Sequence, residues 1–246
     1  MQVWLCPILA FLLGSIPFGL IIAKAKGINI RQHGSGNIGA TNVLRVIGKK
    51  YGITCLLLDA LKGFIPVMIA VSVVQIAGKG HALHIAALDP FALILPAAQQ
   101  FKGQLVHVLT ALAAVLGHNY SPWVGFKGGK GIATSAGVLL ALMPAGIILL
   151  AMIWLIVFAA SRYVSLASIV AAAALPLITH IGARFHHLNN DKLQPTLWEA
   201  GTWNRPLFFF SLVIAALAIW KHQSNIQRLL AGTEHRFSRK AKSPHV

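Results

Sequence analysis

Long apolar segments separated by polar loops run through the whole chain. Residues 3–23 contain no charged side chain and are long enough to cross about 30 Å of hydrocarbon. The apolar run 132–160 is interrupted by Met143 and Pro144, which predicts two helices joined by a tight turn. The pattern predicts an all-α, polytopic integral membrane protein with seven transmembrane helices. The expected spans are residues 3–23, 53–77, 104–116, the two halves of 132–160, 163–183 and 206–220.

Lys and Arg residues are divided unequally between alternate loops, which predicts the orientation of the chain. Loops 78–103 and 184–205 carry few cations, so we expect both to be enlarged external loops. The first of them holds an apolar run broken by Asp89 and Pro96, which we interpret as an interfacial excursion. The N-terminus is then expected outside and the C-terminus in the cytoplasm. The cation-rich, cytoplasmic segments are 24–50, 118–131, Arg162 and the tail 221–246.

Composition agrees with this class of protein. The 246 residues are 57% hydrophobic and only 11% charged, and the mean hydropathy is +0.72. A formal net charge of +16 arises from 21 Lys and Arg against five Asp and Glu. In so apolar a chain these cations favour anionic lipid headgroups and phosphorylated substrates as partners, and no nucleic acid. Cys6 and Cys55 lie in apolar segments, so we expect neither a disulfide framework nor a metal site.

A glycine-rich stretch at 117–134 reads GHNYSPWVGFKGGKGIAT and is the strongest candidate for chemistry. Its glycines let backbone N–H groups converge, and a helix beginning at Ile132 would aim its N-terminus at the same point. With Lys130 this makes a phosphate cradle, although a tight turn with a lysine reaching solvent is the alternative. It is not a Walker A loop, because Val124 stands where that motif needs glycine. The glycines concerned are Gly128, Gly129 and Gly131.

A second polar loop, within 24–50, places hydroxyl and amide side chains among glycines. This composition suits a second oxyanion site, and an ordinary turn-rich loop is the alternative. Asp59 and Lys62 lie three residues apart inside the second expected span. They form either a mutual ion pair or a part of the site. The loop residues concerned are Ser35, Gly36, Asn37, Thr41, Asn42 and Arg45.

At these residues the chain resembles the bacterial membrane acyl-phosphate:glycerol-3-phosphate acyltransferases. The resemblance implies transfer of a fatty acyl group from acyl phosphate to glycerol 3-phosphate, the first step of phospholipid synthesis. It further implies a single transmembrane acyltransferase domain over 1–246, in the bacterial inner membrane, with the active site facing the cytoplasm. It does not extend to loops 79–103 and 184–205. The matching stretches are GSGNIGATNVLR at 34–45, DALKG at 59–63, 117–134, and KHQSNIQRL at 221–229.

The resemblance also implies the site residues. The expected catalytic residues are Lys130, Ser35, Asn37, Arg45, His222 and Asn225. The expected substrate-binding residues are Gly36, Thr41, Asn42, Asp59, Lys62, His118, Gly128, Gly129, Gly131, Ser165, Arg228 and Glu234.

The chemistry that we expect needs neither a cofactor nor a covalent nucleophile, because acyl phosphate is already activated. Lys130 would stabilise the charge that develops on the departing phosphate. Ser35 and Asn37 could donate hydrogen bonds to the acyl phosphate from the facing loop. The general base is open between His222, His118 and a phosphate oxygen of the substrate. Acyl-chain preference and oligomeric state are also left open.

Two other interpretations compete with this one. His84 with Asp89, and His186 with Asp191, form the H-x4-D pattern of unrelated acyl-CoA-dependent acyltransferases, but both lie in expected external loops. A membrane transporter of an organic phosphate or another anion would share the helix breaks and the cations near the membrane. Against it, the sequence has no internal repeat, and its polar motifs gather on one expected face.

Overall fold

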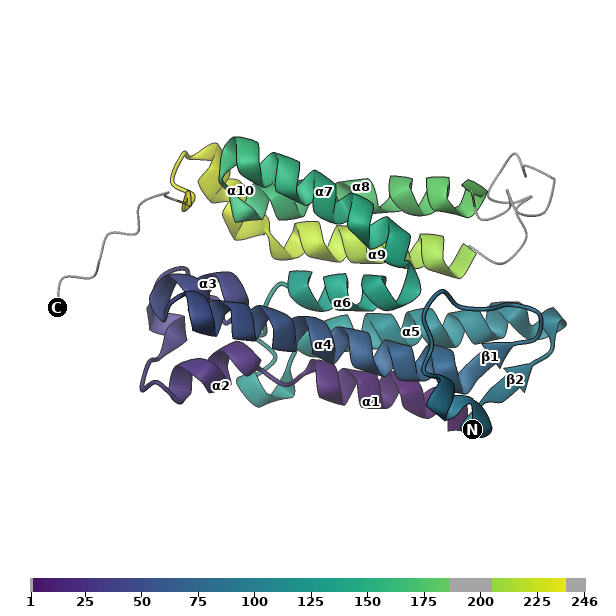
Figure 1. Cartoon of the computed structure of the whole chain (residues 1–246). Helices are drawn as coiled ribbons and strands as arrows, with labels where there is room; N and C mark the ends of the chain where they lie inside the picture. Colours follow the sequence, from purple (N-terminus) through teal and green to yellow (C-terminus); the bar gives the residue numbers. More distant parts are fainter. Residues whose placement is uncertain (1, 186–204, 238–246) are drawn as a thin grey trace.

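The computed structural model describes residues 2–185 and 205–237, and most of them are helical, as the sequence predicts (Figure 1). The expected loop 184–205 lies mostly outside the described residues. The α-helices are α1 Leu5–Gly14, α2 Phe18–Lys24, α3 Ala40–Val46, α4 Lys49–Val73, α5 Gln100–Asn119, α6 Ile132–Leu142, α7 Pro144–Ser161, α8 Val164–Phe185, α9 Arg205–Lys221 and α10 Gln223–Leu230. Short 3-10 helices are η1 Gln2–Trp4, η2 Ile30–Gln32, η3 Ala86–Phe91, η4 Ala97–Gln99 and η5 Pro122–Val124. The strands are β1 Val74–Ile76 and β2 Leu93–Leu95.

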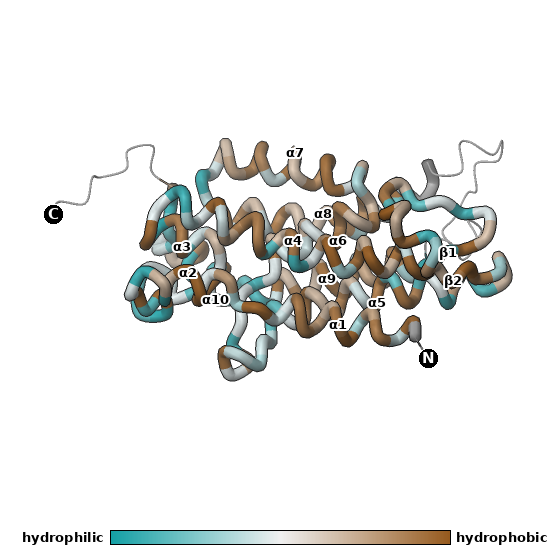
Figure 2. Tube along the Cα trace, turned by 60° about the horizontal axis from the view of Figure 1, so that its bottom comes forward, coloured by the Kyte–Doolittle hydropathy of each residue, from teal (hydrophilic) through white to brown (hydrophobic). Residues whose placement is uncertain are grey.

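The helices lie in two layers along one long axis, with α6 between the layers (Figure 1). One layer contains α7, α8 and α9, and the other contains α1, α4 and α5. α2, α3 and α10 lie together at one end of the molecule, and β1, β2 and the N-terminus lie at the other. Figure 2 shows hydrophobic residues along the middle of the helices and hydrophilic residues gathered towards the two ends. The arrangement is that of a membrane-embedded bundle with two polar ends.

Several segments are long and apolar enough to cross a membrane. Within the described residues there are four: Leu5–Lys24 (α1 with α2), α4, α7, and Val164–Gly182 in α8. α9 and α10, which are bent by 55° relative to each other, make a fifth if the pair is counted as one span. α6 is shorter, and α5 is less apolar because Lys102, Gln104 and His107 lie along it. A multi-pass membrane protein is therefore confirmed.

Prolines accompany two breaks between helices, of which the sequence predicts one. The run 132–160 divides into α6 and α7 at Met143 and Pro144, as predicted. The first expected span is also divided, because Pro17 has no N–H group and α1 ends at Gly14. Ser15 caps this end by donating its hydroxyl hydrogen to the carbonyl of Leu12 at 2.7 Å.

The long loop 78–103 is more ordered than we expected, and two boundaries beside it were wrong. β1 and β2 pair in parallel, with Val74 opposite Leu93, so the expectation of an all-α chain missed a small sheet. α5 begins at Gln100 rather than at 104, because the polar residues of its first turn do not interrupt the helix. α4 covers Lys49–Val73 rather than 53–77, since the chain passes from it directly into β1.

α6 is held against α4 by close contact between their backbones. A Cβ atom at Gly137 would lie 1.9 Å from the carbonyl oxygen of Ala60, and one at Gly63 would lie 2.4 Å from that of Thr134. Small residues allow membrane helices to approach this closely and to gain dispersion contacts. This contact fixes the position of the N-terminus of α6, which opens into the site described next.

Candidate active site

A large pocket lined by described residues begins at the end of the molecule where α3 and α10 lie and extends between the helices. Its volume is about 750 Å³, and α3, α4, α6, α7, α8, α9 and α10 all contribute to its walls. One end of the pocket is polar and the other is apolar. Most of the predicted site residues line it: Ser35, Asn37, Thr41, Asn42, Arg45, Asp59, His118, Lys130, Gly131, Ser165, His222, Asn225, Arg228 and Glu234. Gly36, Lys62, Gly128 and Gly129 do not.

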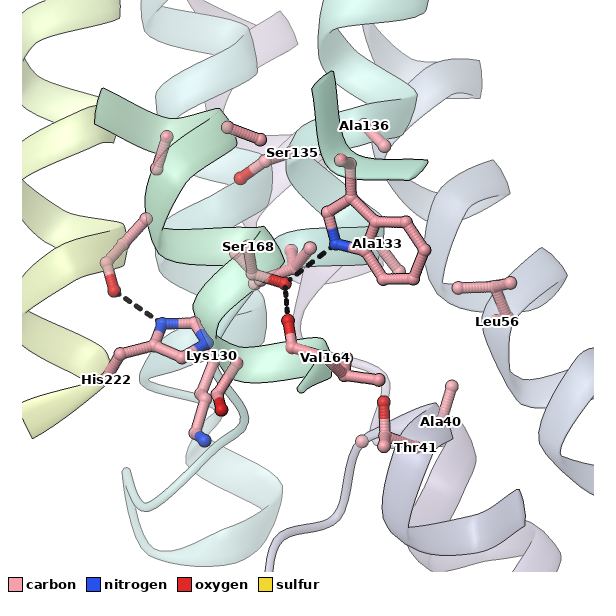
Figure 3. A pocket seen from close by; sticks show the side chains of 18 of the residues that line it. Ala40, Thr41, Leu56, Lys130, Ala133, Ser135, Ala136, Val164, Ser168 and His222 are labelled. Carbon is pink, nitrogen blue, oxygen red and sulfur yellow. Dashed lines mark hydrogen bonds between the residues drawn. The ribbon is translucent and has the colours of Figure 1, made fainter. Parts of the chain in front are cut away.

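The N-terminus of α6 opens into the pocket next to Lys130, as the sequence predicts. α6 begins at Ile132, and no side chain caps its first N–H groups, so these donors are available to a ligand. Gly131 precedes it with a φ of +80°, and a Cβ there would lie 2.7 Å from the Oδ1 atom of Asn119. Figure 3 shows Lys130 and His222 close to one another at this end of the pocket.

The amides of Gly128 and Gly129 do not converge on the pocket, contrary to our prediction. The N–H of Gly128 donates to the carbonyl of Asn119, and that of Gly129 donates to the carbonyl of His118, each at 3.2 Å. Carbonyl groups at the C-terminal end of a helix need such donors. The two glycines therefore cap α5 and fix the loop, which leaves Lys130 and the first turn of α6 to meet an anion.

Asn42 organises the loop that contains Ser35 and Asn37. Its side chain is 2% exposed, and Nδ2 donates to the carbonyls of His33 and Asn37 at 3.0 and 2.9 Å. Its Oδ1 accepts from the N–H of Ser35 at 2.9 Å. Because the loop backbone already uses both ends of this amide, Asn42 shapes the loop rather than binding a substrate directly as we had expected.

Asn37 and Arg31 complete this loop. The Oδ1 of Asn37 accepts from the N–H of Gly39 at 2.8 Å, at the start of α3, so the Nδ2 group is the end of Asn37 that a ligand can use. Arg31 donates to the carbonyl of Lys127 at 2.8 Å and thereby ties this loop to the one before α6. The sequence motifs did not single out Arg31, because nothing local in them indicates a contact 96 residues away.

A chain of hydrogen bonds crosses the polar end of the pocket. Lys130 Nζ donates to the Oδ1 of Asn225, and Asn225 Nδ2 donates to Oε1 of Glu234 at 2.6 Å. Ser165 Oγ donates to the same Oε1 at 2.7 Å, and Arg228 Nε donates to Oε2 at 2.7 Å. The network connects four segments: α8, α10, the start of the tail, and the loop that precedes α6.

The charged groups of this network change one another's acidity. Burial lowers the pKa of Lys130 to about 8, helped by Arg228 and Arg45 and opposed by Glu234. Burial alone would raise the pKa of Glu234, but hydrogen bonds from Ser165, Asn225 and Arg228 hold it below its usual range. At neutral pH the polar end of the pocket thus combines the ammonium of Lys130 and the guanidinium groups of Arg45 and Arg228 with the carboxylate of Glu234.

His222 lies in the bend between α9 and α10 and presents an unprotonated ring nitrogen. Its Nδ1 lies 2.7 Å from the carbonyl oxygen of Ala218, and a carbonyl can only accept, so Nδ1 carries the hydrogen. Nε2 of the neutral ring is then left as an acceptor. His222 is 3% exposed and lines the pocket, so a substrate hydroxyl can reach this acceptor only from inside the pocket.

Asp59, Lys62 and His118 form a buried cluster beneath the glycine loop. Lys62 Nζ lies 2.8 Å from Asp59. It also donates to the carbonyl of Ile16 at 2.6 Å, and so gives a hydrogen-bond donor to this carbonyl at the helix break before Pro17. Lys62 does not line the pocket, so of the two interpretations of this residue, the ion pair with Asp59 is the one that fits. His118 Nδ1 lies 3.7 Å from Asp59, and its other nitrogen lies against Gly129.

The apolar end of the pocket extends from the polar end between α6, α7 and α8. Trp154 on α7 donates its indole hydrogen to Ser168 on α8 at 3.1 Å, and this bond crosses one wall (Figure 3). Sequence reasoning missed these residues because α7 is apolar all round, so its pattern does not indicate which side faces a cavity. The other apolar lining residues of α6, α7 and α8 include Leu139, Ile147, Leu150, Ala171, Ala172 and Leu175.

The competing H-x4-D pattern lies away from this pocket. His84 and Asp89 are 3.7 Å apart, about half exposed, in the segment at the opposite end of the molecule. His186 and Asp191 lie outside the described residues. No group of three or more His, Cys, Asp or Glu that could hold a metal ion occurs in the described part of the chain.

Known proteins of one family match this chain along nearly its full length. The family model described as glycerol-3-phosphate acyltransferase matches residues 4–232. The chain is 42% identical to a glycerol-3-phosphate acyltransferase of Aquifex aeolicus (strain VF5), covering 94% of this chain and 96% of that protein. It is 40% identical to the glycerol-3-phosphate acyltransferase of Geobacter sulfurreducens, covering 93% and 94% of the two chains.

Solved structures are similar as well. A crystal structure of PlsY, an integral membrane glycerol 3-phosphate acyltransferase, in its glycerol 3-phosphate form has a TM-score of 0.73 to this chain. The two are 40% identical, and the match covers 97% of this chain and 96% of the other. None of these relatives supports the alternative of an anion transporter. By sequence and by fold, the chain belongs to the glycerol-3-phosphate acyltransferase family.

Proposed function

We propose that the protein transfers a fatty acyl group from acyl phosphate to glycerol 3-phosphate, giving 1-acylglycerol 3-phosphate and inorganic phosphate. The observation that carries this proposal is a single pocket with a cationic end and an apolar end. Both substrates have a phosphate group, and only the donor has a long hydrocarbon chain. The reaction is the first step of phospholipid synthesis, and its product is itself a membrane lipid.

The polar end provides separate groups for the two phosphates. Lys130 and the first N–H groups of α6 suit the phosphate of the donor, with Ser35 and Asn37 on the facing loop. Arg45 lines the same end and suits the phosphate of glycerol 3-phosphate. Ser165 and Asn225 also line it, but both donate to Glu234, so they shape this end rather than donate to the phosphate. A hydrocarbon chain attached to the donor would then lie between α7 and α8. This places the reacting carbonyl where the polar and apolar ends meet.

The chemical step follows from these positions. A hydroxyl oxygen of glycerol 3-phosphate attacks the carbonyl carbon of the donor, and the bond from that carbon to the phosphate oxygen breaks. The phosphate departs with the bonding electrons, and Lys130 stabilises the charge that it gains. The hydroxyl proton passes to Nε2 of His222, the acceptor that the ring leaves free. No bond to the protein forms at any stage.

We expect His222→Ala to lower the rate of transfer about a hundredfold or more, because it removes the acceptor for the hydroxyl proton. His84→Ala, at the other end of the molecule, should keep the wild-type rate. Initial rates of both purified variants measure this difference. An inactive but folded His84→Ala variant would revive the H-x4-D mechanism.

We further propose seven membrane spans in a bacterial inner membrane, with the N-terminus outside and the pocket facing the cytoplasm. The proposal rests on the excess of cations in the loops beside the pocket. In a chain with Cys6 and Cys55 replaced by alanine, Ala87→Cys should react with an impermeant maleimide on intact cells. Thr233→Cys should react only after the cells are permeabilised. Reaction of both cysteines on intact cells would contradict this topology.

The function itself is tested by product balance. Purified protein supplied with acyl phosphate and glycerol 3-phosphate should form ester and inorganic phosphate in equal amounts. Phosphate release without ester would indicate a hydrolase and would contradict the proposal.

A further inference from the structure

The carboxylate of Glu234 lies inside the cationic end of the pocket, where a substrate phosphate would be expected. The side chain is only 7% exposed. Both of its oxygens accept hydrogen bonds from protein donors on α8 and α10. A carboxylate repels a phosphate, so direct binding of the substrate phosphate does not explain why Glu234 occupies this place.

The backbone holds Glu234 there. α10 ends at Leu230, and Gly232 turns the chain with a φ of +69°. The N–H groups of Thr233 and Glu234 then both donate to the carbonyl of Arg228, at 2.8 and 3.1 Å. Beyond this turn, the N–H of Phe237 donates to the carbonyl of Arg162 at 3.0 Å, which anchors the segment on the turn between α7 and α8.

Glu234 determines which end of the Asn225 amide faces Lys130. The Nδ2 group of Asn225 donates to Glu234, so Oδ1 points to the ammonium of Lys130 and accepts from it. The opposite orientation would set the amide hydrogens against an ammonium and its oxygen against a carboxylate. Both contacts would be repulsive, so the carboxylate locks the amide in a single orientation.

We propose that Glu234 is a positioning residue, which places the ammonium of Lys130 through Asn225 and keeps it charged for the departing phosphate. This inference rests on the proposed function for the role of Lys130. It replaces the direct contact with substrate that the sequence led us to expect for Glu234.

The charge of Glu234 also acts on Lys130 directly. Burial lowers the pKa of Lys130 to about 8, and Glu234 opposes that effect. Removal of the carboxylate charge must therefore lower the pKa of Lys130 further. The charged and titratable groups that line the pocket around Lys130 are Arg45 on α3, Asp59 on α4, His118 on α5, His222 between α9 and α10, Arg228 on α10, and Glu234 and His235 beyond it.

Two variants separate charge from geometry. Transfer requires protonated Lys130, so the wild-type rate should fall as the pH rises through about 8. Glu234→Gln removes the charge, so this alkaline limb should move to lower pH. Glu234→Asp keeps the charge and shortens the side chain, so its limb should stay at the wild-type pH although its rate falls. Asp89→Asn, at the far end of the molecule, is the matched control and should change neither the rate nor the limb.

At neutral pH, Glu234→Gln should lower kcat about ten- to a hundredfold, the usual effect of losing one charged hydrogen bond. The same substitution should lose most of this effect in an Asn225→Ala background, because the amide that it acts through is absent. Fully additive effects, or an alkaline limb of Glu234→Gln at the wild-type pH, would overturn the inference.

The effect of Glu234 on Lys130 can also be measured without any enzymatic turnover, so that it is tested independently of the proposed function. The rate of acetylation of Lys130 by acetic anhydride, followed against pH by mass spectrometry, reports the ammonium directly. The Glu234→Gln profile should shift to lower pH even if the wild type had a different substrate. An unchanged profile would contradict the role of Glu234, whereas absence of acyl transfer by the wild type would contradict the function alone.

Discussion

Replacement of Lys130 by alanine should lower the rate of acyl transfer about a hundred- to a thousandfold. The reason is that a group aimed at developing charge, in a site shielded from water, typically contributes about 3–4 kcal/mol to the barrier. Lys130 is the cation beside the uncapped N-terminus of α6, and it lines the pocket. Lys130→Met, which keeps the length of the side chain, should be no more active than Lys130→Ala. Initial rates of the purified variants measure the effect.

Lys127 provides a matched control on the same loop. It is exposed and does not line the pocket, and its described hydrogen bonds, to Val124 and from Arg31, are made by its backbone. Lys127→Ala should therefore keep a rate within a few-fold of the wild type. If Lys130→Ala kept more than about a tenth of the wild-type rate, stabilisation of the departing phosphate by this lysine would be excluded.

Filling the apolar end of the pocket should change which donors the enzyme accepts. Ala172 on α8 lines this end, and Ala172→Phe would occupy the space between α7 and α8. Each buried methylene of the donor contributes about 0.8 kcal/mol of binding, so exclusion of several methylenes lowers kcat/KM by more than about a hundredfold. We expect this loss with hexadecanoyl phosphate and a much smaller one with octanoyl phosphate.

The neighbouring residue on the same helix is the control. Ala173 is exposed on the outside of α8 and does not line the pocket. Ala173→Phe should therefore leave the preference between the two donors unchanged. Equal losses with both donors in Ala172→Phe, at unchanged folding, would show that the hydrocarbon chain binds elsewhere.

The helices and the polar end could be predicted because their signals are local. Pro144 and the apolar runs set the helices, and Lys130 next to a run that begins at Ile132 indicated the anion site. The predicted loops do meet in a single pocket, although only the distribution of cations suggested that they share a face.

Other features depend on contacts between distant segments and left no local signal. The amides of Gly128 and Gly129 cap α5, a use that the glycine motif itself does not reveal. Asn42 and Lys62 are polar residues in site motifs, yet both bond to backbone of the protein. The apolar end of the pocket was not predicted, because a helix that faces lipid on one side and a cavity on the other is apolar on both.

The pairing of β1 with β2 escaped prediction for a related reason. Each strand has only three residues, the segment between them contains Asp89 and Pro90, and Pro96 directly follows β2. Such a segment is typical of a loop, and the pairing of strands so short depends on the helices beside them.

The choice of acyl donor tests the account most directly. Purified wild-type protein should be supplied with glycerol 3-phosphate and either hexadecanoyl phosphate or hexadecanoyl-CoA, while formation of the ester is followed. We predict rapid transfer from the acyl phosphate and none above background from the thioester, because the cationic end of the pocket suits a phosphate leaving group. Equal turnover with hexadecanoyl-CoA would contradict the phosphate-cradle mechanism.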